Sequence, residues 1–259
     1  MHHVLEATDF TAADLDAELQ ENIAATRSRL NVDIGDPAAA VAGLRAAIET
    51  PLGPALGGIS LREVARSDRL DELDFELPLA GGDEATGWLT LAAIRDVLRD
   101  HLPAGDPLAG YADRLDDQAL RQQVRGFLTG SLDLVIRIPG EAGPRFAVLD
   151  YKTNWLAGPD QELTAWHYRP APLAAEMEYR HYGLQALLYT VALHRYLRWR
   201  VRGYDPERHL AGVLYLFLRG MIGPGTPTVG GVPCGVFSWR PSRALVEALS
   251  DALEVRAAR

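Results

Sequence analysis

The stretch from Ala211 to Arg219, AGVLYLFLR, limits most strongly how this chain can fold, because it is almost entirely apolar. A run of this kind, without alternating polar residues, is expected of a central strand whose two faces are both covered. Just before it, the sequence predicts one long helix over Tyr182 to Arg202. The chain is therefore expected to be an α/β protein with a sheet in its interior.

Two further strands are predicted upstream of that helix. They cover Gly126 to Ile138 and Arg145 to Lys152, and each contains an apolar run. A short segment rich in glycine and proline separates them, so we expect the two strands to pair as a hairpin. Residues 159–180, between this hairpin and the long helix, are predicted to form a polar connection.

The first 70 residues are predicted to be mainly helical. Thr11 is placed to cap a helix that carries Leu15 and Leu19, and Ala38 to Ile48 is a second helical stretch. We expect one domain over residues 1–259, with a helical N-terminal part over 1–70 and a core over 71–259. Three more elements are predicted in that core: a short strand over Phe75–Leu79, a helix over Leu89–Leu98 and a closing helix over Ser242–Val255.

Residue usage excludes several classes of protein. The one cysteine, Cys234, rules out an internal disulfide framework, a four-cysteine zinc site and a cysteine-ligated iron–sulfur cluster. The only lysine, Lys152, follows a tyrosine, so the Gly-Lys-Ser/Thr of an ATP-binding P-loop is absent. No apolar run reaches the roughly 18 residues of a membrane span, and the start, MHHVLEATDF, does not resemble a signal peptide. We therefore expect a cytoplasmic protein that makes no membrane contact.

The charge of the chain is unevenly distributed. Residues 1–110 carry 20 acidic and 8 basic side chains, a net charge of −12, whereas residues 111–259 carry 15 acidic and 18 basic ones, a net charge of +3. This distribution argues against tight nonspecific nucleic-acid binding by the N-terminal part. The charge of residues 111–259 does not argue against nucleic-acid binding.

The triplet Asp150-Tyr151-Lys152 is the sharpest chemical feature. Side chains two apart on a strand share a face, so Asp150 and Lys152 are expected side by side. Asp133 lies inside the preceding apolar strand, and pairing of the two strands would let both carboxylates converge on one Mg²⁺. A metal-bound water beside an ammonium suits phosphodiester hydrolysis. The alternative is a structural Asp–Lys pair with a buried, hydrogen-bonded Asp133.

The sequence around this triplet resembles that of one nuclease family. GSLDLVIR, FAVLDYKTNW, YGLQALLYTVALHRYLRWR and GVLYLFLRG are similar to the C-terminal nuclease domain of RecB, the helicase–nuclease subunit of RecBCD, within the PD-(D/E)xK nuclease superfamily. HHVLEATDF, FELPL and FSWRPSRALVEAL carry the resemblance more weakly over the rest of the chain. It implies a restriction-endonuclease-like core, with a central mixed sheet flanked by helices and a helical N-terminal region. It also implies a Mg²⁺-dependent deoxyribonuclease, with Mn²⁺ as a possible substitute.

The resemblance implies a role for each residue of the hairpin. Asp133 matches the family's first metal-binding aspartate, although Leu132 stands where the superfamily name expects proline. Asp150 matches the second metal-binding carboxylate, and Lys152 matches the catalytic lysine. The backbone carbonyl of Tyr151 is a further candidate metal ligand.

The resemblance adds residues from two helices. Gln185 and Tyr189 match the family's Q-x-x-x-Y motif, and their spacing places them on one helix face, where they could touch the lysine or a DNA phosphate. A simple contact between helix and sheet is the alternative. In the H-x-x-(L/F)-E pattern, His2 takes the position of the metal-binding histidine, and His3 is one residue out of register. Three alternatives therefore remain: His2 completes the metal site, His3 completes it, or neither does.

Other residues could contact DNA. Four arginines near the end of the long helix could bind phosphate, although cations there also suit the helix dipole: Arg195, Arg198, Arg200 and Arg202. Trp155 and Trp166 could stack on single-stranded bases, with packing as the alternative. Arg219 could reach the DNA or form a structural ion pair.

The leading hypothesis is a RecB-like DNA nuclease domain with exonuclease or endonuclease activity, acting in double-strand-break repair and recombination. The resemblance implies the helicase part of RecB, RecC- and RecD-like subunits and single-stranded DNA ends as partners, with RecA as a further candidate. The alternative is a catalytically weak or silent nuclease-like module that docks proteins in a helicase–nuclease complex. The complete set of Asp133, Asp150 and Lys152 argues against that alternative.

Overall fold

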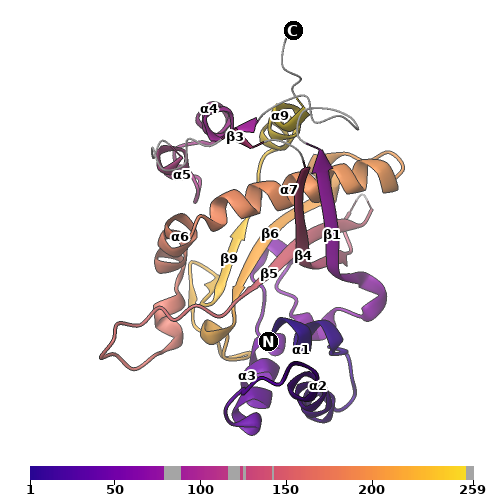
Figure 1. The fold of residues 1–259 in the computed structure, drawn as a ribbon, viewed down its shortest axis with the longest axis vertical. Helices are drawn as coiled ribbons and strands as arrows, with labels where there is room; N and C mark the ends of the chain where they lie inside the picture. The colour runs from indigo at the N-terminus through magenta and orange to yellow at the C-terminus, as the bar shows by residue number, and fades with distance from the viewer. Residues whose placement is uncertain (79–88, 116–122, 125–126, 142, 255–259) are drawn as a thin grey trace.

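A computed structural model describes residues 1–78, 89–115, 123–124, 127–141 and 143–254 of the chain (Figure 1). The α-helices are α1 (His2–Ala7), α2 (Leu15–Leu30), α3 (Pro37–Glu49), α4 (Leu91–His101), α5 (Tyr111–Arg114), α6 (Pro170–Tyr179), α7 (Tyr182–Arg200), α8 (Pro206–His209) and α9 (Arg243–Glu254). The strands are β1 (Arg69–Pro78), β2 (Leu89–Thr90), β3 (Gln123–Val124), β4 (Phe127–Ile138), β5 (Arg145–Lys152), β6 (Leu210–Phe217), β7 (Thr228–Val229), β8 (Val232–Pro233) and β9 (Val236–Trp239). Short 3₁₀ turns include η5 (Ala165–Tyr168) and η6 (Leu218–Gly220). Leu79, Gly126 and Val255, each at the end of a predicted element, lie outside the described residues.

A mixed sheet of five strands forms the centre of the molecule, in the order β1-β4-β5-β6-β9. Strands β4 and β5 pair antiparallel as the predicted hairpin, and β5 pairs parallel with β6. The parallel pair is possible because α7 crosses over between β5 and β6. Every residue of β6 is buried, so the prediction of a central strand is confirmed.

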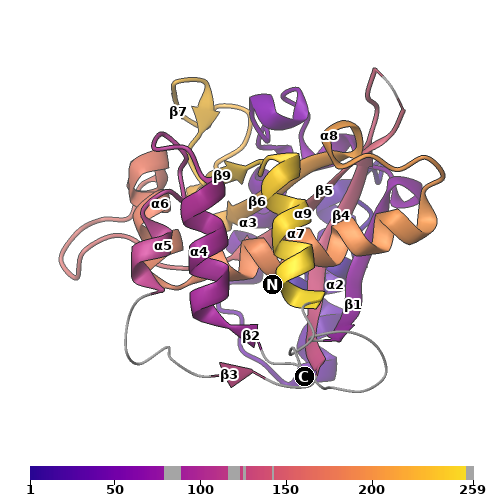
Figure 2. The same cartoon turned by 90° about the horizontal axis from the view of Figure 1, so that it is seen from above.

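Helices cover both faces of this sheet, as Figures 1 and 2 show. The helices α4, α7 and α9 pack on one face, and the N-terminal helices α1, α2 and α3 pack on the other. Strand β6 supplies both cores alternately: Val213 and Tyr215 point to the α7 side, whereas Leu214 and Leu216 point to the N-terminal helices. The predicted class is confirmed: an α/β protein with a mixed sheet, flanking helices and a helical N-terminal part.

Several predicted boundaries were wrong. Asp14, rather than Thr11, caps α2, because its Oδ1 accepts the Ala17 amide at 3.0 Å, while Thr11 is bonded to the Asp9 carboxylate. The helix predicted from Leu89 begins at Leu91, after β2, and its cap is Thr90. The first core strand, predicted from Phe75, begins already at Arg69.

The segment 159–180 is not simply a polar connection. It contains η5 and the ten-residue helix α6, which begins with Pro170 at a position where a missing amide hydrogen costs nothing. Leu173 and Met177 on this helix are buried against the α7 side of the sheet. Among the described residues, no helix combines the length and hydrophobicity needed to cross a membrane.

Substitution of Gly212 tests the junction between β5 and β6. Gly212 has a φ of 120°, next to a shift in the β5–β6 register, and an added Cβ would lie 2.6 Å from the Trp239 carbonyl oxygen. We expect Gly212→Ala to lower the free energy of unfolding by about 3 kcal/mol, from backbone strain and overpacking together. Urea denaturation measures this change. Gly225→Ala is the control, since Gly225 has open space around it; equal stabilities of the two variants would contradict the prediction.

Candidate active site

The register of the hairpin brings two carboxylates together. Leu134 on β4 pairs with Leu149 on β5, so Asp133 and Asp150 are the next residues on each strand. The Tyr151 amide donates a hydrogen bond of 2.9 Å to Asp133 Oδ2. The Asp133 carboxylate thereby stays at this end of the hairpin, beside the Asp150-Tyr151-Lys152 triplet.

Lys152 lies on the same face of β5 as Asp150, as the spacing predicts. Its Nζ is 2.5 Å from Asp150 Oδ2 and donates a hydrogen bond of 3.2 Å to Gln185 Oε1. The ammonium also lies 4.2 Å from the centre of the Tyr182 ring and 5.2 Å from that of Tyr215, within reach of cation–π attraction. The Lys152 side chain is only 13% exposed, so these contacts hold it in one place.

Gln185 and Tyr189 join the site through α7. Gln185 Nε2 donates a hydrogen bond of 2.7 Å to the Tyr189 hydroxyl, while Gln185 Oε1 accepts from Lys152. The contact with the lysine that the motif implies is present, and so is the Gln185–Tyr189 pair of the alternative. Gln185 therefore connects the charged groups of β5 to the surface of α7.

Two tyrosines of the site were not predicted. The Tyr215 hydroxyl donates a hydrogen bond of 3.1 Å to Gln185 Oε1, and its ring is stacked against Tyr182. Tyr215 lies directly across from Asp150 in the parallel register of β5 and β6. The signal was present in the sequence, because a tyrosine inside an apolar central strand needs a partner for its hydroxyl.

The electrostatics of the site follow from burial. Burial raises the pKa of Asp150 to about 7; the neighbouring Lys152 ammonium opposes this increase and the Asp133 carboxylate adds to it. Burial also raises the pKa of Tyr189 and Tyr215 far above the ordinary value of tyrosine. Both tyrosines therefore remain protonated hydrogen-bond donors at neutral pH.

His2 lies at the carboxylates and His3 does not. His2 Nε2 is 2.9 Å from the Tyr151 carbonyl oxygen, and His2 Nδ1 is 3.9 Å from Asp133 Oδ2. The His2 side chain is 47% exposed, so it lies at the solvent side of the site. Successive residues of a helix point about 100° apart, which is why the neighbouring histidine faces elsewhere.

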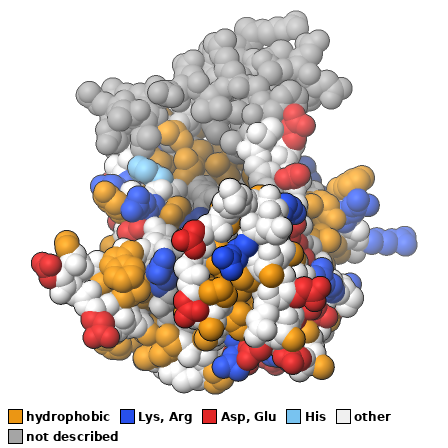
Figure 3. Space-filling model, turned by 60° about the horizontal axis from the view of Figure 1, so that its bottom comes forward, with side chains coloured by type: hydrophobic (Ala, Val, Ile, Leu, Met, Phe, Trp, Pro, Cys, Tyr) orange, Lys and Arg blue, Asp and Glu red, His pale blue; other side chains and the backbone are white. Residues whose placement is uncertain are grey.

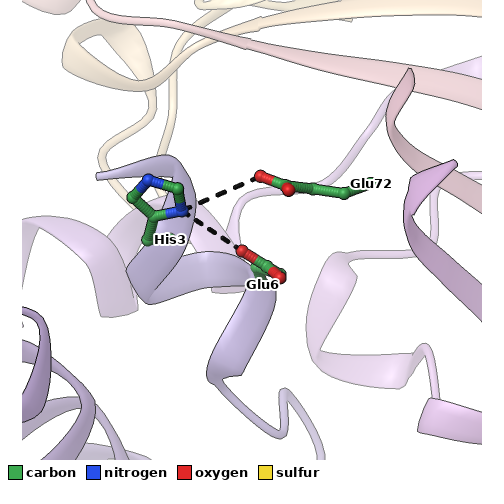
Figure 4. A group of neighbouring side chains, drawn as sticks. All are labelled: His3, Glu6 and Glu72. Atoms are coloured by element: carbon green, nitrogen blue, oxygen red, sulfur yellow. Dashed lines mark hydrogen bonds and ion pairs between the residues drawn. The ribbon is translucent and has the colours of Figure 1, made fainter. Parts of the chain in front are cut away.

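His3 belongs to a different group, drawn in Figure 4. Its Nδ1 is 3.3 Å from Glu6 Oε2 and 3.8 Å from Glu72 Oε1. Histidine, cysteine, aspartate and glutamate side chains can bind metal ions. Among the described residues, His3, Glu6 and Glu72 are the one group of three such side chains whose ligand atoms all lie within 4.8 Å of one another. The ligand atoms of His2, Asp133 and Asp150 do not all lie within 4.8 Å of one another; Asp150 is paired with Lys152, and Asp133 accepts from the Tyr151 amide.

Helix α1, which carries His2, is held in place by Arg69, which no sequence motif singles out. The Arg69 guanidinium, only 1% exposed, donates to the backbone carbonyls of Thr8 at 2.6 Å and of Glu6 at 3.2 Å. It forms an ion pair of 3.1 Å with Asp71 and lies 4.0 Å from the centre of the Phe10 ring. These contacts join the end of α1 to the first strand of the sheet.

The remaining candidates divide into exposed and structural residues. Trp155 and Trp166 are 56% and 54% exposed, each beside an arginine: Arg219 lies 5.6 Å from the Trp155 ring centre and Arg169 lies 5.5 Å from that of Trp166. Arg195 donates a 2.8 Å hydrogen bond to the Ser250 carbonyl and so joins α7 to α9. The Arg200 guanidinium lies over the ring of Trp199, 4.1 Å from its centre, on the exposed end of α7.

Known proteins align with most of this chain, although no protein-family model matches it. The RecBCD enzyme subunit RecB of Mycolicibacterium smegmatis is 49% identical over 259 residues, which cover 99% of this chain and 24% of that subunit. For the Mycobacterium tuberculosis subunit the identity is 48%, over 98% of this chain and 23% of the relative. For Escherichia coli RecB the identity is 36%, over 80% of this chain and 15% of the relative.

The chain is homologous to a part of RecB. It spans about a quarter of the length of the two mycobacterial RecB subunits. The identity extends over nearly the whole chain, so both the N-terminal helices and the sheet are part of the RecB-related sequence. The resemblance to RecB that the motifs indicated is thereby confirmed.

Loss of Arg69 tests how α1 is attached to the sheet of this RecB homologue. Arg69→Met removes the donor to two carbonyls and leaves Asp71 without its ion-pair partner, so we expect the free energy of unfolding to fall by about 3 kcal/mol. Urea denaturation followed by circular dichroism measures the loss. Arg66→Met is the matched control, since the exposed Arg66 bonds only the Ala7 carbonyl among the described residues; a loss as large there would contradict the prediction.

Proposed function

We propose that this chain is a Mg²⁺-dependent deoxyribonuclease that hydrolyses phosphodiester bonds. The observation that carries the proposal is the arrangement of Asp133, Asp150 and Lys152 at one end of the β4–β5 hairpin, with Gln185 bonded to the lysine. Two carboxylates beside a held ammonium combine groups that attract a divalent cation with one that stabilises a phosphate. The homology to RecB supports this assignment.

The donors near the carboxylates fit a divalent metal ion. Asp150 Oδ2 is buried and accepts no hydrogen bond of regular geometry from the described residues; only the Lys152 ion pair balances its charge. A buried carboxylate oxygen of this kind is suited to a hard cation. We propose that Asp133, Asp150, the Tyr151 carbonyl and His2 would hold Mg²⁺, with Mn²⁺ as a substitute. Bound Mg²⁺ polarises a phosphate and lowers the pKa of a coordinated water.

The protein groups around the carboxylates have separate tasks in this proposal. Lys152 Nζ stabilises the negative charge that develops on the phosphate during attack. Gln185 keeps the ammonium in position, because its Oε1 accepts from Lys152 while its Nε2 donates to Tyr189. The Tyr189 hydroxyl accepts that bond, so its own proton can be donated to a phosphate oxygen.

The biological setting is inferred from the RecB relatives, which are named as RecBCD enzyme subunits. We propose that the chain acts in the cytoplasm in double-strand-break repair and recombination. The P-loop motif is absent from its sequence, so the helicase part of RecB would supply the motor. RecC- and RecD-like subunits and RecA are the proposed protein partners, and single-stranded DNA ends are the proposed substrate.

The surface charge bears on the alternative of a silent docking module. Figure 3 shows acidic, basic and apolar side chains intermixed on the end of the molecule that carries the N-terminal helices. Such a mixed surface, together with the −12 charge of residues 1–110, gives DNA little general attraction. The site itself argues for activity, because protein docking does not require a buried carboxylate, Asp150, in contact with the Lys152 ammonium.

Replacement of Lys152 is the direct test of the nuclease proposal. We expect Lys152→Ala to lower the rate of Mg²⁺-dependent cleavage of linear single-stranded DNA by about 10²- to 10³-fold, through loss of transition-state stabilisation. Lys152→Arg should lose activity as well, since a planar guanidinium does not replace a compact ammonium. Release of labelled nucleotides measures the rate. Arg137→Ala, at an exposed ion pair with Asp68, is the control; equal cleavage by Lys152→Ala and the wild type would refute the nuclease proposal.

The raised pKa of Asp150 predicts how metal binding depends on pH. When the pH is below the Asp150 pKa of about 7, the carboxyl is mainly protonated, and the proton competes with the cation. The apparent affinity for Mn²⁺, measured by titration calorimetry, should therefore rise between pH 5.5 and 7 and level off above pH 7. Asp150→Asn should bind Mn²⁺ weakly with a shallower pH dependence, whereas the exposed Asp74→Asn should follow the wild type. A wild-type affinity that does not change from pH 5.5 to 7.5 would contradict the prediction.

A further inference from the structure

An open pocket of about 390 Å³ lies between α3 and the segment that follows β6. The α3 wall is lined mainly by small residues, among them Ala39 and Gly43, with Leu44 as its one large side chain. Leu218 and Ile222 belong to the opposite wall, and the lining is mostly apolar. An open apolar space with mainly small residues on one side has room for a flat ring system.

The pocket adjoins the proposed active site through the chain itself. Thr153, which lines the pocket, directly follows Lys152, and Met1, which also lines it, directly precedes His2. His2 is in turn 2.9 Å from the Tyr151 carbonyl. Thr153 and Leu218 directly follow β5 and β6, so the pocket opens at the same end of these strands as Asp150 and Lys152.

A cation and an aromatic ring lie at the edge of the pocket. Arg219 lines it and donates a hydrogen bond of 3.0 Å from Nε to the Thr153 carbonyl, which fixes the base of the guanidinium. The guanidinium lies 5.6 Å from the centre of the exposed Trp155 ring. A fixed guanidinium beside an apolar pocket can bind a phosphate while the pocket takes the group attached to it.

We propose that this pocket binds one unstacked nucleobase of a DNA strand whose neighbouring phosphate lies at Asp133, Asp150 and Lys152. The inference rests on the proposed nuclease function and specifies its substrate. A base that is paired and stacked inside a duplex cannot enter such a pocket, whereas a base in a single strand can. The pocket therefore selects single-stranded DNA.

An apolar peptide segment from a protein partner is the competing occupant. The guanidinium of Arg219 and the shared border with the carboxylates favour a nucleotide, because a nucleotide joins an apolar ring to an anion over a short distance. A peptide would use the apolar walls and leave the cation without a matching anion. Binding by the two kinds of occupant can be separated with DNA that has lost its bases.

Gly43 allows the pocket to be filled without disturbing the fold. A Cβ added at Gly43 would meet nothing within 4 Å, so Gly43→Phe places a ring in the pocket instead of the core. Ala42→Phe is the matched control, since Ala42 is the adjacent exposed residue of α3 and does not line the pocket. Neither residue belongs to the proposed catalytic set.

The test compares binding of two fluorescent 15-mers by the 259-residue chain, one of thymidine nucleotides and one of abasic nucleotides. With Ca²⁺ in place of Mg²⁺, anisotropy should show the wild type binding the thymidine strand about tenfold more tightly than the abasic strand, the usual contribution of a bound base. Gly43→Phe should lose this preference and bind the abasic strand as the wild type does. Ala42→Phe should keep the preference.

Two results would overturn the inference: a wild type that binds both strands equally or not at all, or a Gly43→Phe variant that retains the preference. Either would leave an apolar peptide as the occupant to examine. Because the readout is binding, failure of the proposed nuclease activity is seen separately, as a lack of Mg²⁺-dependent cleavage by the wild type. The two proposals therefore fail in distinguishable ways.

Discussion

The alternation of side chains along β5 is the constraint on which both the core and the site depend. Ala147, Leu149 and Tyr151 point to the N-terminal helices, whereas Val148 points to the side of α7. Asp150 and Lys152 continue the face of Val148 to the end of the strand, where α7 supplies Gln185. A shift of one residue in the register would turn these charged groups into the core beneath the N-terminal helices, so the packing of two apolar cores also sets the direction of the lysine.

The buried charge of Asp150 separates a functional reading of the site from a structural one. Its side chain is 2% exposed, and burial raises its pKa to about 7 even though the Lys152 ammonium is 2.5 Å away. A structural Asp–Lys pair at a strand end would be more stable at the surface, where neither charge loses its hydration. The fold instead keeps a carboxylate whose negative charge is not fully compensated, an arrangement typical of positions where binding or chemistry provides the balance.

The parts of the molecule that depend on local periodicity could be predicted from the sequence. The patterns that predict β6, the β4–β5 hairpin and the helix α7 each lie within a short stretch of consecutive residues. The site residues were found through the spacing in Asp150-Tyr151-Lys152 and through the family motifs. The helix α6 was missed because its prolines at 170 and 172 indicate a break, although proline is well tolerated in the first turn of a helix. The Arg69 contacts join residues about 60 positions apart, and no local pattern reveals such a distance.

The shape of the site explains why its cation is a lysine in a chain whose other 25 basic residues are arginines. The Lys152 ammonium lies between the Asp150 carboxylate, Gln185 Oε1 and the faces of Tyr182 and Tyr215, all within about 5 Å of its nitrogen. A compact charge with three donors fits this space and keeps a donor for the phosphate of the proposed reaction, whereas a planar guanidinium would have to displace a ring or the amide. The one lysine among the 26 basic residues of the chain therefore stands at a position where the size and donor geometry of the cation decide which side chain fits.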